Sequence, residues 1–157
     1  MNNLYEVFDV PPESWINCLP IYQQNIINDL YQQTNNFDKT AEAWLSASVP
    51  ENVPFGTTKN SKLFLEKVAD EIELFFTNDE KYKNCKLAIL KESGAVQSFV
   101  IGAISAALAP ALGKSAVFLA PVIAIIFTTI TQIGLNAWLS YRAELHTKNN
   151  STSKSDI

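Results

Sequence analysis

The chain has 157 residues, of which 47% are hydrophobic, and its formal net charge is −4 at pH 7. This length predicts one domain, or one domain with an appendage. The composition argues against binding to nucleic acid, because neutralising phosphates requires clustered Lys and Arg, and the sequence has no basic cluster of that kind. We therefore expect no nucleic-acid partner.

Charged residues are distributed unevenly along the chain. Residues 1–94 contain 14 of the 16 acidic and 8 of the 12 basic residues, which gives this part a net charge of −6. Between residues 95 and 141, Lys114 is the one charged residue. The sequence therefore predicts three parts: an acidic cytosolic helical domain over residues 1–92, a hydrophobic helical hairpin over residues 93–141, and a polar, disordered tail over residues 142–157.

The two cysteines and the first residues indicate the compartment. Cys18 and Cys85 have no CxxC spacing, which favours ordinary thiols in a reducing compartment over a structural disulfide. Residues 1–10 have no basic segment followed by a long apolar segment, so we expect no signal peptide.

The acidic part opens with a segment that we expect to be coil, over residues 1–12. Apolar residues at i, i+4 spacing then predict a helix over residues 15–33, which either kinks at Pro20 or begins there, because proline cannot donate to the helical ladder. A second helix is predicted over residues 38–48. Pro, Asn and Gly cluster over residues 49–56 and predict a loop.

Two more amphipathic helices follow, over residues 62–76 and 80–91. In the first, apolar residues form one stripe, while acidic residues that include Asp70, Glu71 and Glu73 face away and are interpreted as a solvated surface. Trp15 and Trp44 are predicted core residues. Four amphipathic segments with no strand-like alternation predict a small all-α bundle.

The apolar run divides into two predicted helices, over residues 95–112 and 116–139, joined by a turn at residues 113–115. Each is close to the roughly 20 apolar residues that cross a bilayer. Pro121 lies in the first turns of the second helix, where a missing N–H is tolerated. The fold class is therefore an N-terminal bundle followed by a two-span transmembrane hairpin. We expect Trp138, Tyr141 and Arg142 to anchor one membrane interface and Lys114 the other.

Each predicted span has a distinctive face. In the first span, small residues lie within about a third of the helix circumference and predict a helix-packing or oligomer face: Ser98, Gly102, Ser105, Ala106 and Ala109. In the second, the corresponding polar face consists of Thr128, Gln132 and Asn136. Either the two faces pack together, or the polar face lines a water path or an oligomer interface.

Basic residues flanking the run predict its topology. Several lysines precede the first span, Arg142 and Lys148 follow the second, and Lys114 alone lies between them. The positive-inside tendency then places both termini in the cytoplasm and predicts a multi-pass protein of the inner or plasma membrane.

The sequence predicts no catalytic, cofactor-binding or metal-binding residues, and we expect no enzyme activity. The segment Gly113-Lys114-Ser115 ends like a phosphate loop, but Leu108 stands where the first glycine is needed. His146, the one histidine, falls in the predicted tail and has no evident catalytic partner.

Three functions remain open at this point. The first is a small non-catalytic integral membrane protein, whose cytosolic domain binds a protein partner and whose hairpin anchors in the lipid membrane and self-associates. The second is a membrane-perturbing or pore-forming effector whose hairpins oligomerise. The third is a soluble helical bundle that buries the hairpin.

Overall fold

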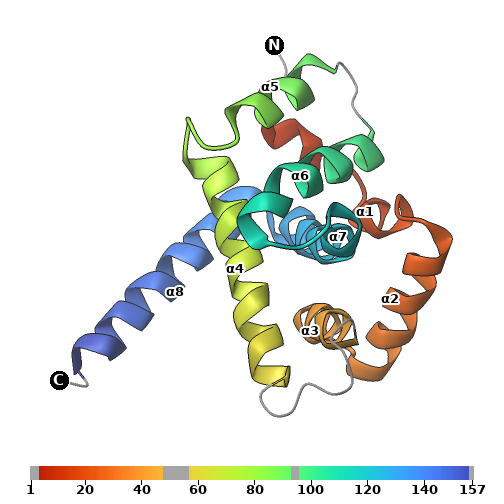
Figure 1. Ribbon diagram of the computed structural model, residues 1–157. Helices are drawn as coiled ribbons and strands as arrows, with labels where there is room; N and C mark the ends of the chain where they lie inside the picture. Colours follow the sequence, from red (N-terminus) through yellow and green to blue (C-terminus); the bar gives the residue numbers. More distant parts are fainter. Residues whose placement is uncertain (1–3, 48–56, 93–95, 156–157) are drawn as a thin grey trace.

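The computed structural model describes residues 4–47, 57–92 and 96–155, with η1, a 3-10 helix over Leu4–Phe8, and eight α-helices (Figure 1). These residues contain no strand, which confirms the predicted all-α class. The loop predicted over residues 49–56 and the first residue of the apolar run, Ala95, lie outside the described ranges.

The N-terminal helices begin and end at residues with recognisable roles. The helix predicted over residues 15–33 is divided into α1 (Ser14–Asn17) and α2 (Ile21–Thr34), with Pro20 as the N-cap of α2. Asn35 ends α2 in the left-handed conformation, at φ 52°. The side chain of Asn36 then accepts a hydrogen bond of 2.9 Å from the Lys39 N–H at the start of α3 (Phe37–Ala47).

Helices α4 (Thr57–Thr77) and α5 (Lys83–Lys91) follow. Asn78 turns the chain between them, because its side chain accepts hydrogen bonds from the N–H groups of Glu80 and Lys81 at 3.0 and 2.9 Å. Tyr82 precedes α5 at φ 63°. Its hydroxyl donates to Glu71 of α4, which ties the two helices together.

The predicted hairpin turn is confirmed. Helix α6 (Gln97–Leu112) ends at Gly113, which is left-handed at φ 68°, and α7 (Ala116–Ile133) begins after Ser115, whose hydroxyl accepts from the Phe118 N–H at 3.2 Å. The second predicted span, however, is shorter than expected. It ends at Ile133 because Gly134, at φ 95° and ψ 145°, breaks the helix.

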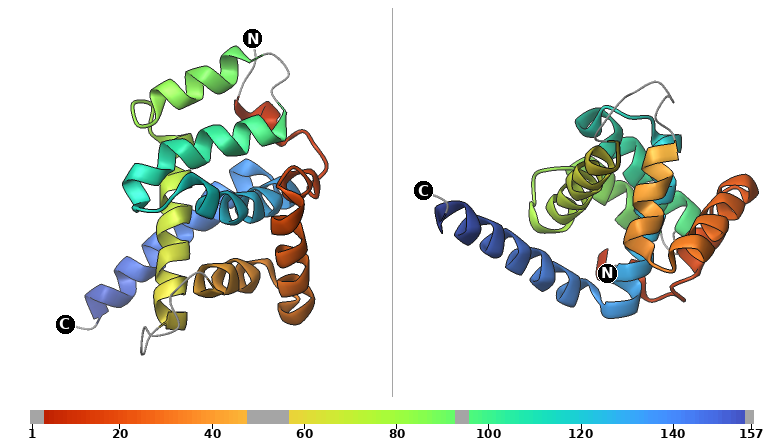
Figure 2. Two further views of the ribbon diagram at one scale, coloured as in Figure 1. Left: turned by 45° about the vertical axis from the view of Figure 1, so that its right-hand side comes forward. Right: turned by 90° about the horizontal axis from the view of Figure 1, so that it is seen from below.

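The predicted disordered tail is wrong for the residues that the structure describes. A new helix, α8, runs over Leu135–Ser155 and extends away from the body of the molecule (Figures 1 and 2). Its first half is held in place by Trp138 and Arg142, which are only 5% and 3% exposed. The polar composition of residues 142–157 suggested disorder, but burial of Trp138 and Arg142 anchors a helix that continues beyond these two residues.

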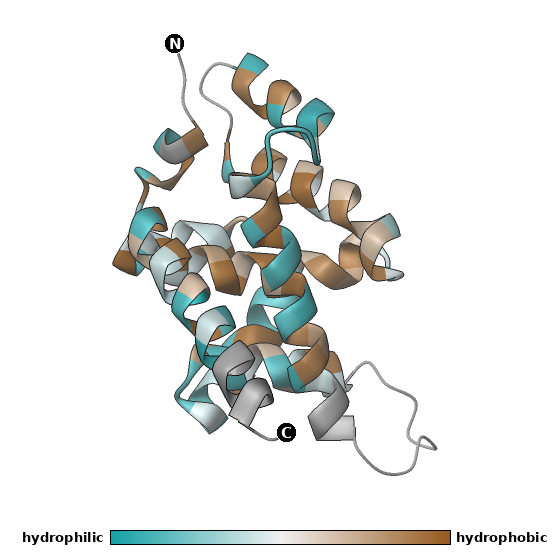
Figure 3. Ribbon diagram, turned by 90° about the vertical axis from the view of Figure 1, so that its left-hand side faces the viewer, coloured by the Kyte–Doolittle hydropathy of each residue, from teal (hydrophilic) through white to brown (hydrophobic). Residues whose placement is uncertain are grey.

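Helix α7 lies at the centre of the fold, where it packs against η1, α1, α3, α4 and α6 (Figure 2). The hydrophobic core draws residues from both sides of position 92, so the acidic helices and the apolar hairpin share one core. Figure 3 shows hydrophobic residues concentrated in the helices that cross the middle of the molecule. Trp15 and Trp44 are core residues as predicted, at 0% and 8% exposed.

Candidate functional site: the central apolar helix and its enclosure

Helix α7 has the composition of a membrane span and the position of a core helix. Its 18 residues include no charged side chain, and it is the one described helix that is long and apolar enough to cross a membrane. Ten of these residues are buried. A helix that is apolar all round must be covered on all sides, and here α6 and the helices of the acidic part supply the cover. Helix α6, with 16 residues, is a shorter apolar helix.

Aromatic rings from three elements enclose the middle of α7. The ring of Phe127 lies 5.1 Å from those of Phe8 and Trp15 and 6.2 Å from that of Phe76, measured between centroids. These partners come from η1, α1 and α4. Edge-on and tilted aromatic pairs add to the free energy gained by burying their area, so this cluster stabilises the enclosed position of α7.

Polar side chains of the enclosing helices also bind the α7 backbone. Pro121 has no N–H, so the carbonyl of Val117 lacks its usual partner four residues ahead. The side-chain amide of Gln23 on α2 donates to this carbonyl at 3.2 Å. The indole N–H of Trp44 on α3 donates to the Phe118 carbonyl at 3.0 Å. The first turn of α7 is thus held by two other helices.

Near the other end of α7, the indole N–H of Trp15 donates to the hydroxyl of Thr131 at 2.7 Å. That hydroxyl in turn donates to the Phe127 carbonyl at 2.8 Å. This hydrogen bond satisfies the indole N–H of Trp15, whose side chain is completely buried.

The small-residue face predicted on α6 points mainly outward. Gly102, Ala106 and Ser98 are exposed, and a Cβ placed on Gly102 would have nothing within 4 Å. The large residues on the other side are buried against the core: Val100, Ile101, Ile104 and Leu108. Among the described residues the small face therefore does not pack on the polar face of α7.

The two remaining small residues lie at the margin of that face. Ala109 is half-buried, and Ser105 is 1% exposed with a hydroxyl that has no hydrogen-bond partner. The use of the small-residue face between copies of the chain stays a prediction.

The predicted polar face of the second span is divided between two helices. Thr128 is buried, and its hydroxyl donates to the Ala124 carbonyl of its own helix at 2.8 Å. Gln132 is exposed near the end of α7, while Asn136 is exposed on α8, beyond the break at Gly134. The three side chains thus form no continuous face in this structure. The prediction assumed one straight helix, whereas the chain breaks at Gly134 into two helices.

The predicted interfacial residues also separate. Lys114 is exposed at the hairpin turn, with its ammonium group 5.8 Å from the centre of the Phe118 ring. Tyr141 is 54% exposed. Trp138 and Arg142 are instead buried, with the guanidinium 5.9 Å from the centre of the indole.

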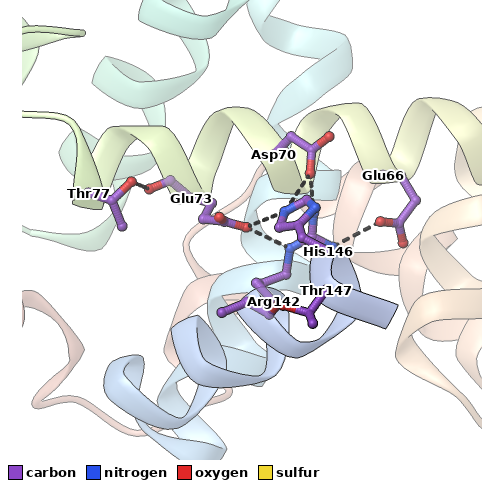
Figure 4. Close-up of polar contacts among 8 residues, drawn as sticks. Glu66, Asp70, Glu73, Thr77, Arg142, His146 and Thr147 are labelled. Atoms are coloured by element: carbon purple, nitrogen blue, oxygen red, sulfur yellow. Dashed lines mark hydrogen bonds and ion pairs between the residues drawn. The ribbon is translucent and has the colours of Figure 1, made fainter. Parts of the chain in front are cut away.

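Arg142 is the centre of an ion cluster that joins α8 to α4 (Figure 4). Its Nη1 lies 2.9 Å from Glu66, its Nε lies 3.1 Å from Glu73, and its Nη2 pairs with Asp70. His146, one turn further along α8, lies 3.1 Å from Glu73. The side chain of Arg142 is 4% exposed, whereas those of Glu66 and Asp70 are 52% and 46% exposed.

The electrostatics of the cluster follow from this geometry. Burial alone would lower the pKa of Arg142, but its hydrogen bonds to Glu66 and Glu73 and the nearby acidic charges outweigh burial and raise it. The ligand atoms of Asp70, Glu73 and His146 lie within 4.8 Å of one another, a spacing that could hold a metal ion. Arg142 already pairs with both of these carboxylates, so the cluster is first of all a clasp between two helices.

Among the described residues, cavities at two places reach the surface of α7. One, of about 300 Å³, lies among α3, α4, α7 and α8, and Ile126 and Thr129 form part of its wall. Asp38 and Glu66 both line this cavity, and burial and the charge of Glu66 raise the pKa of Asp38. The other, of about 320 Å³, lies among α1, α2, α3 and α7 and includes Thr128 and Gln132.

Sequence reasoning missed the clasp and the ties to the backbone of α7. The spacing of Glu66, Asp70 and Glu73 places three acids on one side of α4, and Arg142 and His146 share a face at i, i+4. Each of these two patterns can be seen in the sequence, but nothing in the sequence indicates that the acidic face of α4 meets the basic face of α8. The hydrogen bond from Gln23 to α7 was indicated only weakly, by the Val117 carbonyl that Pro121 leaves without a helical partner.

The fold and site together define an all-helical protein that encloses an apolar, uncharged central helix. No protein-family model, curated protein or solved structure matches the chain.

Proposed function

We propose that this protein is a conditional membrane effector, which keeps the α6–α7 hairpin enclosed in a water-compatible fold and inserts it into a lipid bilayer when the enclosure opens. This combines the membrane-perturbing function with the soluble bundle that buries the hairpin. The single observation that supports it is the burial of ten residues of a charge-free, 18-residue helix between α6 and the helices of the acidic part. We propose no catalytic role.

The cover over α7 favours a conditional arrangement. Lipid tails can replace side chains of the enclosing helices, because both are apolar and the exchange keeps the apolar surface of α7 away from water. Among the described residues, polar ties to α7 are made by Gln23 and Trp44 at its first turn and by Trp15 near its last turn. Opening thus exchanges one apolar environment for another, at the cost of a small set of hydrogen bonds.

The dimensions of the hairpin are compatible with insertion. At 1.5 Å per residue, the 16 residues of α6 extend roughly 24 Å and the 18 residues of α7 roughly 27 Å, close to the hydrocarbon core of about 30 Å. In the inserted state, both termini would stay on the cytoplasmic side, and the turn at Lys114 would cross the bilayer.

The inserted hairpins would self-associate through the outward face of α6. Gly102 and Ala106 on this face are exposed in the enclosed state. Small residues let helix backbones approach closely in lipid, where dispersion and hydrogen bonds drive association.

A second candidate is the constitutive membrane anchor, in which residues 1–92 bind a protein partner and the hairpin resides permanently in the membrane. One observation favours it: the start of α6 already exposes apolar residues, with its N-cap Val96 at 59% and Phe99 at 39%. The two candidates differ in where the full-length protein is found before any trigger.

A reversible lock on the enclosure tests the proposed function. The hydroxyls of Ser46 on α3 and Ser61 on α4 lie 2.7 Å apart, so cysteines at both positions are placed to form a disulfide. The pair is made with Cys18 and Cys85 replaced by Ser. Because α3 and α4 both pack on α7, this bond should prevent opening. The oxidised protein should release no dye from vesicles, and a reductant should restore release.

A second disulfide serves as the matched control. The hydroxyls of Thr34 and Thr40 lie 2.8 Å apart, so cysteines there join α2 to α3 across their own turn and leave α3 free of α4. This variant should release dye whether oxidised or reduced. Carbonate extraction of unmodified, full-length protein completes the test. Recovery only in the extracted membrane would favour the constitutive anchor, and a soluble protein that never releases dye would contradict both membrane functions.

A further inference from the structure

We propose that one end of the molecule, where the α6–α7 turn meets the start of α2, is the surface that first contacts a lipid bilayer. We call it the entry surface and define it by Ile21, Tyr22, Lys114, Val117 and Phe118. The inference rests on the proposed function and adds to it the site at which the enclosed protein meets its membrane.

The entry surface exposes apolar side chains that a water-facing helix normally avoids. Ile21 is 69% exposed, Tyr22 57% and Val117 63%. Exposed apolar side chains gathered in one place mark an interaction site, whereas scattered ones need no explanation. Here they gather at the beginning of α7, which among the described helices is the one that could cross a membrane.

Hydrogen bonds place these residues side by side. The amide nitrogen of Gln23 lies 3.2 Å from the Val117 carbonyl and 3.4 Å from the hydroxyl of Tyr22. The exposed tyrosine of α2 therefore lies next to the exposed valine of α7. Lys114, with its ammonium group over the Phe118 ring, completes the surface on the side of the turn.

The charge of the two segments that form the entry surface favours a bilayer as the occupant. The chain as a whole is acidic, at −4, yet no acidic residue occurs between Pro20 and Asn28 or between Glu92 and Glu144. Over residues 20–28 and 95–141, which contain the entry surface, the chain carries one charge, the cation Lys114. Two segments without acids are compatible with the negative surface potential of a membrane, which attracts lysine and repels carboxylates.

The side-chain types fit the lipid interface. Tyrosine is enriched where headgroups meet hydrocarbon, and lysine extends its ammonium group toward phosphates while its stem stays among apolar groups. Val117 and Ile21 can enter the boundary between headgroups and tails. A protein partner would also cover apolar groups, but it would give no reason for the absence of acids from these two segments.

The same place is a weak point of the enclosure. The side-chain oxygen of Gln23 is buried without a hydrogen-bond partner, so the contact between α2 and α7 leaves one polar group unsatisfied. Parting α2 from α7 frees that group to meet water or lipid headgroups. Contact with a bilayer at the entry surface would therefore favour opening at the start of α7.

Val117→Glu tests the entry surface. The side chain is exposed, and an acid in the first turn of a helix is favoured by the helix dipole, so the fold should be kept. Binding of the full chain to vesicles of phosphatidylcholine with a minority of phosphatidylglycerol, measured by flotation, should weaken about tenfold. Tyr22→Glu, also in a first turn, should do the same.

The matched control is Leu87→Glu, which places the same charge at a residue that is 54% exposed on α5, away from this surface. It should bind vesicles like the unmodified protein. Equal binding by all three variants, or an equal loss in all three, would overturn the entry surface. A protein that never binds vesicles in any form would instead overturn the proposed function.

Discussion

At the scale of single residues, Glu71 shows how a polar contact can outweigh burial. Burial alone would raise the pKa of this carboxyl, but hydrogen bonds from Tyr82 and Lys81 and the charge of Lys81, 2.9 Å away, lower it. The same contact, together with burial, raises the pKa of Tyr82. The trio holds α5 against α4, on the far side of the turn at Asn78.

The pH dependence of stability follows from the direction of this shift. A carboxyl whose pKa is lower in the folded state stabilises the protein above its unfolded pKa, about 4.3 for Glu, and this stabilisation is lost as pH falls through the folded pKa. Glu71→Gln should therefore lower the free energy of unfolding by about 1 kcal/mol at pH 7. The difference should shrink below about pH 4.

Urea unfolding of both proteins at several pH values measures this difference. Glu80→Gln is the matched control, because it removes an exposed acid of the same turn region. A difference for Glu71→Gln that stays constant with pH would show that the ionised carboxylate contributes nothing to stability.

At the scale of elements, the break between α7 and α8 decides what the apolar run can do. Gly134 has φ 95° and ψ 145°, a conformation that residues with a side chain rarely adopt. It turns the chain so that Arg142 pairs with acids of α4 and α8 does not extend the line of α7. Two helices with different partners thus replace one long span.

Gly134→Ala tests the break without a steric complication, because a Cβ at this position would have nothing within 4 Å. The free energy of unfolding should fall by about 1–3 kcal/mol, from backbone strain alone.

Gly102→Ala is its matched control. It has the same open surroundings but lies inside a helix, so alanine should raise stability by about 0.5–1 kcal/mol. Thermal and urea unfolding of both variants measure the two effects. Changes of the same sign would show that strain at Gly134 is not what ends α7.

At the scale of the whole molecule, the ion cluster around Arg142 joins α8, which extends outward, to α4, which covers α7. A buried guanidinium is stabilised only while its acidic partners surround it, and those acids crowd one another without it. Arg142 therefore joins the outer helix α8 to one of the helices that enclose α7.

Arg142→Met should lower the free energy of unfolding by roughly 2 kcal/mol, because three acids lose their shared cation while water still solvates the exposed ones. Hydrogen exchange over residues 135–148 should become faster.

Lys67→Met changes the net charge equally, at an exposed residue of α4, and should alter neither quantity appreciably. Equal effects of the two substitutions would mean that net charge, and not the clasp, is responsible.

Much of the fold could be predicted because local signals determine it. Prolines, asparagines and glycines divide the chain close to where the helices begin and end, as at Pro20, Asn35 and Gly113. Burial of Trp15 and Trp44 also followed from their size and apolar character. The break at Gly134 was missed because one glycine in an apolar run is compatible with a continuous helix.

The site was harder to predict than the fold, because its parts are distant in sequence. The three acids of α4 and Arg142 are about 70 positions apart, and a solvated face and a polar tail are the simplest interpretation of each alone. The outward direction of Gly102 was also hidden, since helical periodicity separates two faces without saying which one is inside.

The sequence by itself determined that the protein is all-helical and that one stretch is too apolar to face water, because periodicity and hydropathy are properties of neighbouring residues. The tertiary structure alone decided what covers that stretch. It placed α7 among the acidic helices, turned the large side of α6 inward and closed α8 onto α4 through Arg142. These outcomes depend on contacts between distant segments, and local patterns do not encode which segments will meet.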